Sequence, residues 1–153
     1  MTIAPARTTV TPRIEIGPES GDHVSVRILH RLDRHPTDDD GGWLVCPVHV
    51  HVGGFSGDVA TALHAREVHR FGSALRAVRQ GLRRTAVLES AEDWIDLTVS
   101  RESDGALTVS GYLADEPGVG SRLRFRIGGL TDADLDAWVA ACDAVDAMHL
   151  SAA

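Results

Sequence analysis

Residues 93–147, with the sequence DWIDLTVSRESDGALTVSGYLADEPGVGSRLRFRIGGLTDADLDAWVAACDAVDA, contain three alternating segments followed by a long amphipathic segment. In each alternating segment, one row of side chains is apolar and the intervening row is mostly polar. This period of two is typical of strands with one face in a core. Three strands of a half-buried sheet are therefore predicted. Their apolar rows are Ile95, Leu97 and Val99; Leu107, Val109, Gly111 and Leu113; and Leu123, Phe125 and Ile127.

The spacing of apolar residues becomes helical after these strands. The hydroxyl of Thr131 is placed to cap the first helical turn, where Asp132 and Asp134 interact favourably with the helix dipole. We expect the helix to lie across the apolar face of the sheet. Its apolar side chains recur at steps of three and four, at Leu135, Trp138, Cys142 and Val145.

The same order of elements occurs earlier in the chain. A short strand over residues 13–17 begins the first copy, as one over residues 85–89 begins the second. The next apolar rows of the first copy are Val24, Val26 and Ile28; Leu44, Cys46, Val48, Val50 and Val52; and Val59, Thr61 and Leu63. A helix is then predicted from Arg66 to Leu82, with its apolar face formed by Val68, Phe71, Leu75, Val78 and Leu82.

These patterns predict an α+β fold, mainly an antiparallel sheet of about eight strands with two helices on one side. A ββββα unit occurs twice, so residues 13–84 and 85–150 are interpreted as pseudo-repeats within one domain of residues 13–150. Residues 1–12, which are rich in Thr, Pro and Ala, are expected to form a disordered arm.

The composition is that of an ordinary globular protein, with 153 residues of which 43% are hydrophobic and 24% charged. No apolar run is long enough to span a bilayer, and residues 1–13 lack the apolar centre of a signal peptide, so we expect a cytoplasmic protein without a membrane partner. The net charge of −7 disfavours nucleic acid and allows a basic protein partner. Cys46 and Cys142 are expected to be reduced thiols in the core.

Two acidic loops are candidates for binding such a protein partner. Asp38, Asp39 and Asp40 lie in a polar connection, and Asp115 and Glu116 lie in a turn that contains a Pro-Gly pair. The first loop lacks the alternating ligands and the distant Glu of a calcium-binding loop. We interpret both loops as solvated acidic patches that can meet arginine or lysine on a partner.

A pair of histidines raises the question of a metal site. His49 and His51 are two residues apart in a predicted strand, so both point to its polar side. Two such imidazoles can bind one metal ion if His64, His23 or Asp58 supplies a third ligand. Structural zinc normally has four ligands at spacings that this chain lacks, so the sequence favours histidines that simply occupy a polar strand face.

Residues 122–126 carry arginine at every second position, and Tyr112 and Trp94 are expected on neighbouring outward rows. Such a surface loosely resembles a nucleic-acid platform. The competing interpretation is pairing of the arginines across strands with Asp96 and Thr108. The negative net charge favours the second interpretation.

Motifs for catalysis are missing from the sequence. It contains no Gly-x-Ser-x-Gly, no phosphate-binding GxxxxGK[ST] and no dinucleotide-binding GxGxxG. Glu89, Glu92 and Asp93 cluster at a predicted turn, where solvated carboxylates are common. We therefore predict neither an enzyme nor a bound cofactor.

Three segments resemble the WapI-type bacterial immunity family and its uncharacterised actinobacterial relatives. They are GGWLVCPVHVHVGGFSGDVATAL (residues 41–63), AVLESAEDWIDLTVS (86–100) and LADEPGVGSRLRFRIGGLT (113–131). The resemblance covers residues 13–148 through strand order, the GGFSG turn and the helix positions. It implies a cytosolic antitoxin-like protein that binds and blocks the nuclease domain of a toxin, and it supplies no catalytic or binding residue.

The leading hypothesis is thus a non-enzymatic immunity protein that offers acidic loops and an exposed sheet face to a toxin domain. One alternative is a small-ligand or metal-binding domain that uses His49 and His51. Another is a homo-oligomeric structural domain, because a homodimer would cover an edge strand or the polar face.

Overall fold

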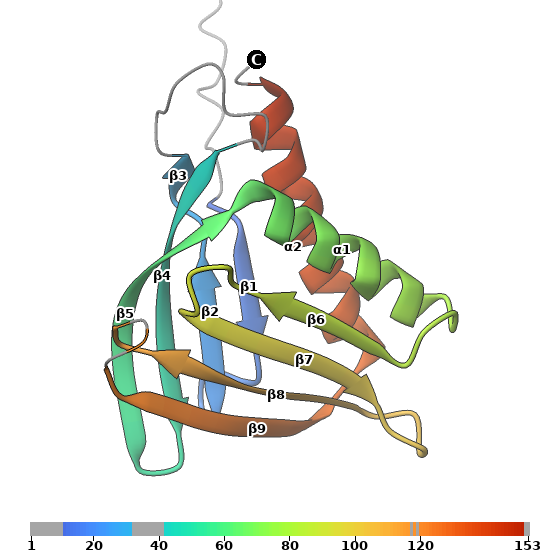
Figure 1. Ribbon diagram of the computed structural model, residues 1–153. Helices are drawn as coiled ribbons and strands as arrows, with labels where there is room; N and C mark the ends of the chain where they lie inside the picture. The colour runs from blue at the N-terminus through green and yellow to red at the C-terminus, as the bar shows by residue number, and fades with distance from the viewer. Residues whose placement is uncertain (1–10, 32–41, 117, 119, 152–153) are drawn as a thin grey trace, which may run out of the picture.

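The computed structural model describes residues 11–31, 42–116, 118 and 120–151 (Figure 1). Sheet A contains β1 (Arg13–Ile16), β2 (His23–Arg27), β3 (His30–Arg31), β4 (Trp43–Val52) and β5 (Phe55–His64). Sheet B contains β6 (Thr85–Glu89), β7 (Ile95–Arg101), β8 (Leu107–Ala114) and β9 (Arg122–Leu130). The helices are α1 (Ala65–Arg79), which follows sheet A, and α2 (Asp132–Ser151), which follows sheet B.

Both sheets are antiparallel meanders with the same strand order. In sheet A, β2 and β3 pair with successive parts of β4, so together they occupy one strand position between β1 and β4. β5 pairs with β4. Sheet B has the order β6-β7-β8-β9. The predicted α+β fold with two ββββα units is therefore confirmed.

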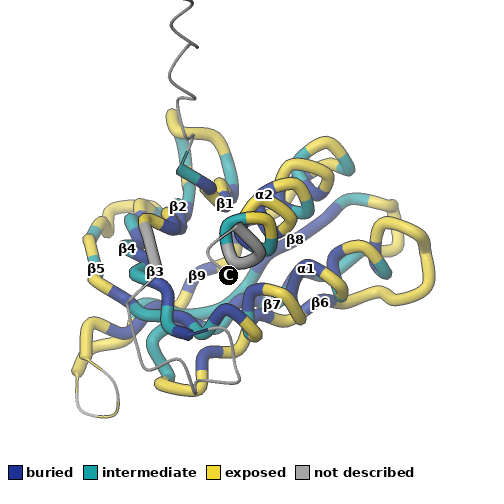
Figure 2. The backbone as a smooth tube through the Cα atoms, turned by 90° about the horizontal axis from the view of Figure 1, so that it is seen from above, coloured by how far each residue is buried: buried dark blue, intermediate teal, exposed yellow. Residues whose placement is uncertain are grey.

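The strand register explains why alternating residues form one core. Val24 pairs with Val50 and Val26 with Val48, so apolar side chains from neighbouring strands share the inner face of sheet A. In sheet B, Val99 pairs with Val109 in the same way. The buried apolar residues of both sheets and both helices belong to one hydrophobic cluster. Figure 2 shows buried segments in both helices and in both sheets. Since period-two strands expose their other face, each sheet keeps an outer polar surface.

The helices interlock the two units. α1 contacts β6, the first strand of the second unit, and α2 contacts β1, the first strand of the first unit (Figure 1). Both helices bury apolar residues at the same intervals, which places Phe71 of α1 and Trp138 of α2 in equivalent positions. Each unit thus completes the core of the other.

The helices approach each other closely at Gly72. A Cβ atom at this position would lie 2.8 Å from the Cβ of Cys142, so only glycine fits there without a shift of α2. Cys142 and Cys46 are both buried free thiols, as predicted.

The sequence placed the end of the first helix too late. Helix α1 ends at Arg79, and Leu82 is 74% exposed, so the prediction that Leu82 lies on the buried face was wrong. The N–H of Gly81 bonds to the carbonyl of Val78, and the N–H of Leu82 bonds to that of Ala77. With a φ of 76° at Gly81, these bonds form a Schellman motif that turns the chain away before Leu82.

Residues 1–10 of the predicted arm and residues 32–41 of the first acidic connection lie outside the described residues. The carbonyl of Pro12, the last residue of that predicted arm, accepts a hydrogen bond from the N–H of Ile28 at 3.0 Å. Within the described part of the chain, no helix combines the length and apolar character needed to cross a membrane.

Candidate partner-binding surface

The second acidic loop lies between β8 and β9. Asp115 and Glu116 are both exposed. The N–H of Asp115 bonds to the carbonyl of Ser121 at 3.1 Å, and that of Gly120 bonds to the carbonyl of Glu116 at 3.0 Å. Neither carboxylate forms an ion pair with another described residue. Asp38, Asp39 and Asp40 lie outside the described residues, so their position relative to this loop stays a prediction.

An apolar groove lies beside this loop, where the β4–β5 hairpin of sheet A faces the β8–β9 turn of sheet B. Its volume is about 330 Å³. The lining residues are mainly apolar, and Phe55 at its rim is 68% exposed. We call it the seam groove. It is lined by Val50, Phe55, Ser56, Gly57, Val59, Leu113, Asp115, Ser121, Arg122 and Leu123.

Sequence reasoning did not identify the seam groove, because its lining residues come from four strands. The GGFSG segment indicated only a turn, although an aromatic residue at a hairpin tip is a sign of an exposed apolar surface. Val52 pairs with Phe55 at the end of the hairpin, and the Phe55 side chain is exposed there. The other walls of the groove come from sheet B, so the groove is visible only in the folded structure.

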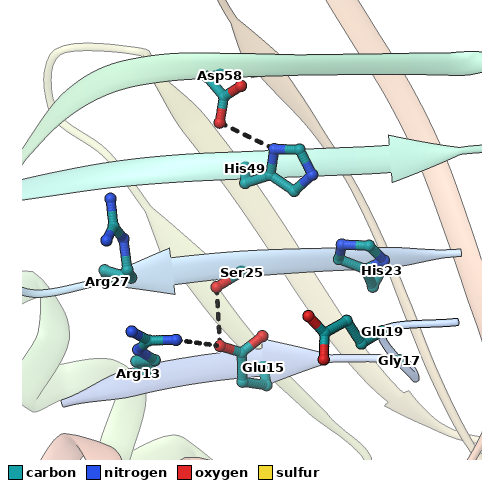
Figure 3. Close-up of a pocket in the computed structure, with 9 residues that line it drawn as sticks. All are labelled: Arg13, Glu15, Gly17, Glu19, His23, Ser25, Arg27, His49 and Asp58. Atoms are coloured by element: carbon teal, nitrogen blue, oxygen red, sulfur yellow. Dashed lines mark hydrogen bonds and ion pairs between the residues drawn. The ribbon is translucent and has the colours of Figure 1, made fainter. Parts of the chain in front are cut away.

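The outer face of sheet A carries His23, His49 and His51, of which Figure 3 shows the first two. His49 and His51 point to the same side, as predicted, and His23 lies opposite His51 in the register. The ring centroid of His23 is 5.4 Å from that of His49 and 5.9 Å from that of His51. The rings of His23 and His49 border a polar hollow of about 660 Å³ that Arg13 and Arg27 also line.

Two imidazoles on this face, those of His49 and His23, each have a separate hydrogen-bond partner. Nδ1 of His49 lies 2.8 Å from Oδ1 of Asp58, and Nδ1 of His23 lies 2.9 Å from the carbonyl oxygen of Gly21. Among the described residues, no three His, Cys, Asp or Glu side chains are grouped so that they could hold a metal ion. The face therefore resembles a polar strand surface more than a metal centre.

The arginine stripe of β9 lies on the outer face of sheet B beside carboxylates. Arg122 is ion-paired with Asp93, and its guanidinium lies 4.6 Å from the centroid of the Tyr112 ring. Arg126 lies 3.8 Å from Glu102. The charge of the stripe is therefore partly neutralised in place.

The sequence suggested that Asp96 and Thr108 pair with this arginine stripe, and the prediction holds only for Asp96. Asp96 lies near Arg124 across Tyr112, and burial and neighbouring acids raise the pKa of its carboxyl group. Thr108 is buried, because the β8–β9 register shifts between Leu107 and Val109, so it does not contribute to the outer face. Asp93, with a φ of 61°, also accepts a hydrogen bond from the hydroxyl of Tyr112.

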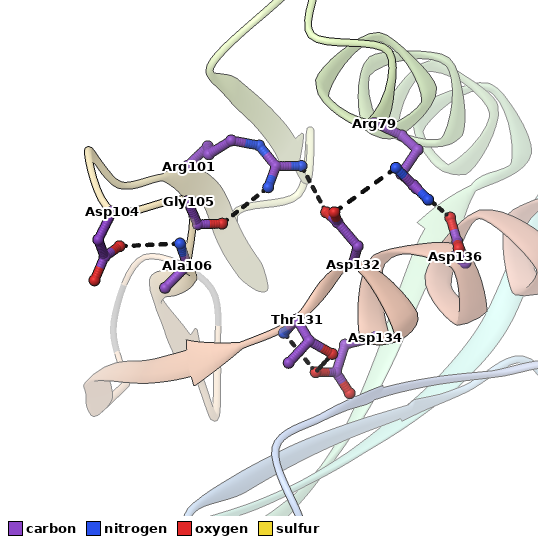
Figure 4. A network of polar contacts seen from close by, with 9 residues as sticks. All are labelled: Arg79, Arg101, Asp104, Gly105, Ala106, Thr131, Asp132, Asp134 and Asp136. Atoms are coloured by element: carbon purple, nitrogen blue, oxygen red, sulfur yellow. Dashed lines mark hydrogen bonds and ion pairs between the residues drawn. The ribbon is translucent and has the colours of Figure 1, made fainter.

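Charged side chains of the two helices form ion pairs with each other. Asp143 pairs with Arg76 and Asp146 with His69, so the helices run antiparallel with complementary charges. Asp132 joins Arg79 of α1 to Arg101 of β7, at 3.7 and 2.8 Å (Figure 4). The hydrogen bond from Arg101 lowers the pKa of Asp132. Because these pairs are exposed to solvent, each one stabilises the fold only weakly.

The sequence pattern that defines the immunity protein WapI-like family matches residues 15–147 of this chain. The chain belongs to this family. The match covers both ββββα units, including the seam groove and the acidic β8–β9 loop. Comparison of this WapI-like chain with curated proteins gives no significant match.

Two solved structures share the fold of the WapI-like chain. The structures of Trypanosoma brucei MRP1/MRP2 align with a TM-score of 0.52 and 13% identity, covering 92% of this chain and 88% of that chain. A guide-RNA-binding protein complex bound to a guide RNA aligns with a TM-score of 0.53 and 13% identity, covering 94% of this chain and 95% of that chain. At this identity, the likeness concerns the fold alone.

The buried thiols of the WapI-like chain are poorly suited to nucleophilic chemistry. Burial raises the pKa of Cys46 and of Cys142 to about 12, so the reactive thiolate is scarce at neutral pH.

Burial also raises the pKa of Glu67, whose Oε2 has no hydrogen-bond partner among the described residues. Glu67 lies at a cleft of about 540 Å³ between α1 and the β6–β7 turn.

Proposed function

We propose that this chain is a cytoplasmic, non-enzymatic binding protein that neutralises a cognate toxin domain. The observation that carries the proposal is the family match across residues 15–147, because the family is one of immunity proteins. The protein would act by covering part of the toxin surface, which requires an exposed area of suitable shape and charge and no reactive group.

We further propose a nuclease as the toxin class. A nuclease must bind a phosphate backbone, so its active surface is commonly basic. The net charge of −7 would attract such a surface and speed its association. Asp115 and Glu116 support this proposal because their charges are exposed and unpaired among the described residues. Most aspartates of α2, by contrast, form ion pairs with other described residues. Asp38, Asp39 and Asp40 remain proposed members of the same acidic surface.

The likeness in fold to a guide-RNA-binding protein raises nucleic acid as another ligand. The arginines most suited to such binding are Arg122 and Arg126, and both lie beside carboxylates. A phosphate backbone would have to compete with these carboxylates and with the negative net charge. We therefore favour a protein partner.

A binding measurement tests the proposal. The purified chain is titrated calorimetrically with candidate toxin domains encoded by the genes beside its own, and the activity of each domain is assayed in parallel. The expected result is a saturable complex with complete inhibition at saturation. A folded chain that neither binds nor inhibits any of these domains, or that binds single-stranded RNA with a strongly salt-dependent affinity instead, would contradict the proposal. Sedimentation of the free chain shows whether a homodimer masks the surface.

A further inference from the structure

The seam groove has the physical character of an anchor pocket. Its floor contains Val50 and Leu113, which are almost fully buried, while Val59 and Leu123 form half-buried sides. A volume of about 330 Å³ is at the small end of the range of ligand pockets, so it suits one or two side chains.

Phe55 makes the groove more apolar than folding requires. Phe55 is 68% exposed, so most of its apolar surface stays in contact with water in the free chain, which is unfavourable. Aromatic side chains next to pockets are common among the residues that dominate protein–protein binding. Burying Phe55 under a partner would remove this unfavourable exposure.

The free charge at the groove is negative. Asp115 lines it and Glu116 follows in the same loop, and neither is ion-paired with another described residue. Arg122, which also lines the groove, is already paired with Asp93 and stacked on Tyr112. An apolar occupant with a positive charge beside it is therefore complementary to the groove, whereas an acidic occupant would be repelled.

We propose that the seam groove receives one apolar side chain of the toxin domain, with an adjacent lysine or arginine of that domain bound by Asp115 and Glu116. This inference rests on the proposed function and names the anchor of its interface. The occupant is a basic protein segment in which a lysine or arginine lies next to the apolar residue.

Short peptides test this chemistry without the toxin. The full chain, labelled with ¹⁵N, is titrated with the capped tripeptides Lys-Leu-Lys, Glu-Leu-Glu and Lys-Ser-Lys. The expected result is that Lys-Leu-Lys binds weakly, with a Kd on the order of 1 mM, and shifts the amide signals of Phe55, Val59 and Leu123. Equal responses to all three peptides, or shifts that lie elsewhere on the chain, would overturn the inference.

Variants connect the groove to the toxin. Phe55→Ser and the double variant Asp115→Asn/Glu116→Gln should each weaken toxin binding by about tenfold or more. Leu82→Ser removes an equally exposed apolar side chain far along the sequence from the groove and should leave binding unchanged. Circular dichroism confirms that each variant is folded.

The outcomes separate this inference from the proposed function. If the wild-type chain inhibits the toxin and the groove variants inhibit it equally well, the groove is not the anchor, while the immunity function stands. If the wild-type chain binds Lys-Leu-Lys at the groove but never inhibits the toxin, the proposed function fails and the inference about the toxin fails with it. Self-association that Phe55→Ser abolishes would assign the groove to a second copy and would also overturn the inference.

Discussion

The indole N–H of Trp138 donates a hydrogen bond to the backbone carbonyl of Glu15, with a nitrogen–oxygen distance of 2.7 Å. This bond joins α2 of the second unit to β1 of the first, across most of the chain. It satisfies a carbonyl of β1, an edge strand that has no neighbour on its outer side among the described strands. The two units are thus held together by directional bonding as well as by apolar packing.

Replacing Trp138 with phenylalanine should test this bond. Phenylalanine keeps most of the buried ring but leaves the Glu15 carbonyl without its donor, so the free energy of unfolding should fall by about 1–3 kcal/mol. Urea denaturation measures this change. Trp94→Phe is the matched control, because the Trp94 side chain donates no hydrogen bond to another described residue, and it should have a much smaller effect. Equal effects of the two substitutions would remove the special role of the bond.

Gly72→Ala should force the helices apart. The added Cβ would lie 2.8 Å from the Cβ of Cys142, and overpacking of this kind costs about 1–3 kcal/mol. Alanine also gains about 1 kcal/mol in helix propensity, so the net loss of stability should be modest and measurable by thermal unfolding. Gly54→Ala, where nothing lies within 4 Å of the added Cβ, should be close to neutral. A Gly72→Ala variant more stable than the wild type would show that the helices are not in close contact here.

Glu67→Gln should stabilise the protein at neutral pH. Burial raises the pKa of Glu67 in the folded state above its value in the unfolded state. The folded chain therefore favours the protonated carboxyl group more than the unfolded chain does. The stability that this preference contributes is present below the unfolded-state pKa and is lost as the pH rises through the folded-state pKa. Glutamine cannot ionise, so the variant does not lose this stability as the pH rises. Chemical denaturation from pH 4 to pH 7 should therefore show that the variant gains on the wild type as the pH rises, and a constant difference would contradict this.

Asp132→Asn should show the opposite pH dependence. The hydrogen bond from Arg101 lowers the folded-state pKa of Asp132, so its contribution is present above the unfolded-state pKa and is lost as the pH falls through the folded-state value. The asparagine variant should be less stable than the wild type at neutral pH, and the two curves should converge in acid. Asp104→Asn, at an exposed aspartate without an ion pair among the described residues, is the control.

The fold was largely predictable from the sequence because each element depends on a local periodicity. The alternation of residues 95–127 and the helical spacing from Leu135 to Val145 gave the strands and α2, since burial of one face is a property of each segment. The end of α1 was missed because the apolar spacing continues to Leu82 beyond the glycine that terminates the helix.

The candidate site was much less predictable. Asp115 and Glu116 were found because acidic residues in a turn are visible in the sequence. The apolar groove beside them was not found, because Phe55 and Leu123 are distant in the chain and become neighbours only where the two sheets meet. The exchange of helices between the units was also not foreseen, since periodicity shows that a helix face is buried but not against which strand.

Protection of growing cells is the most direct test of the central claim, which is that this protein neutralises a toxin domain by binding it. The toxin domain encoded by a neighbouring gene is expressed from an inducible promoter, with and without the full chain. The account predicts that the wild-type chain and Leu82→Ser restore growth, and that Phe55→Ser restores it less well at equal protein levels. Cells that die equally fast with and without abundant, folded wild-type chain would contradict the account.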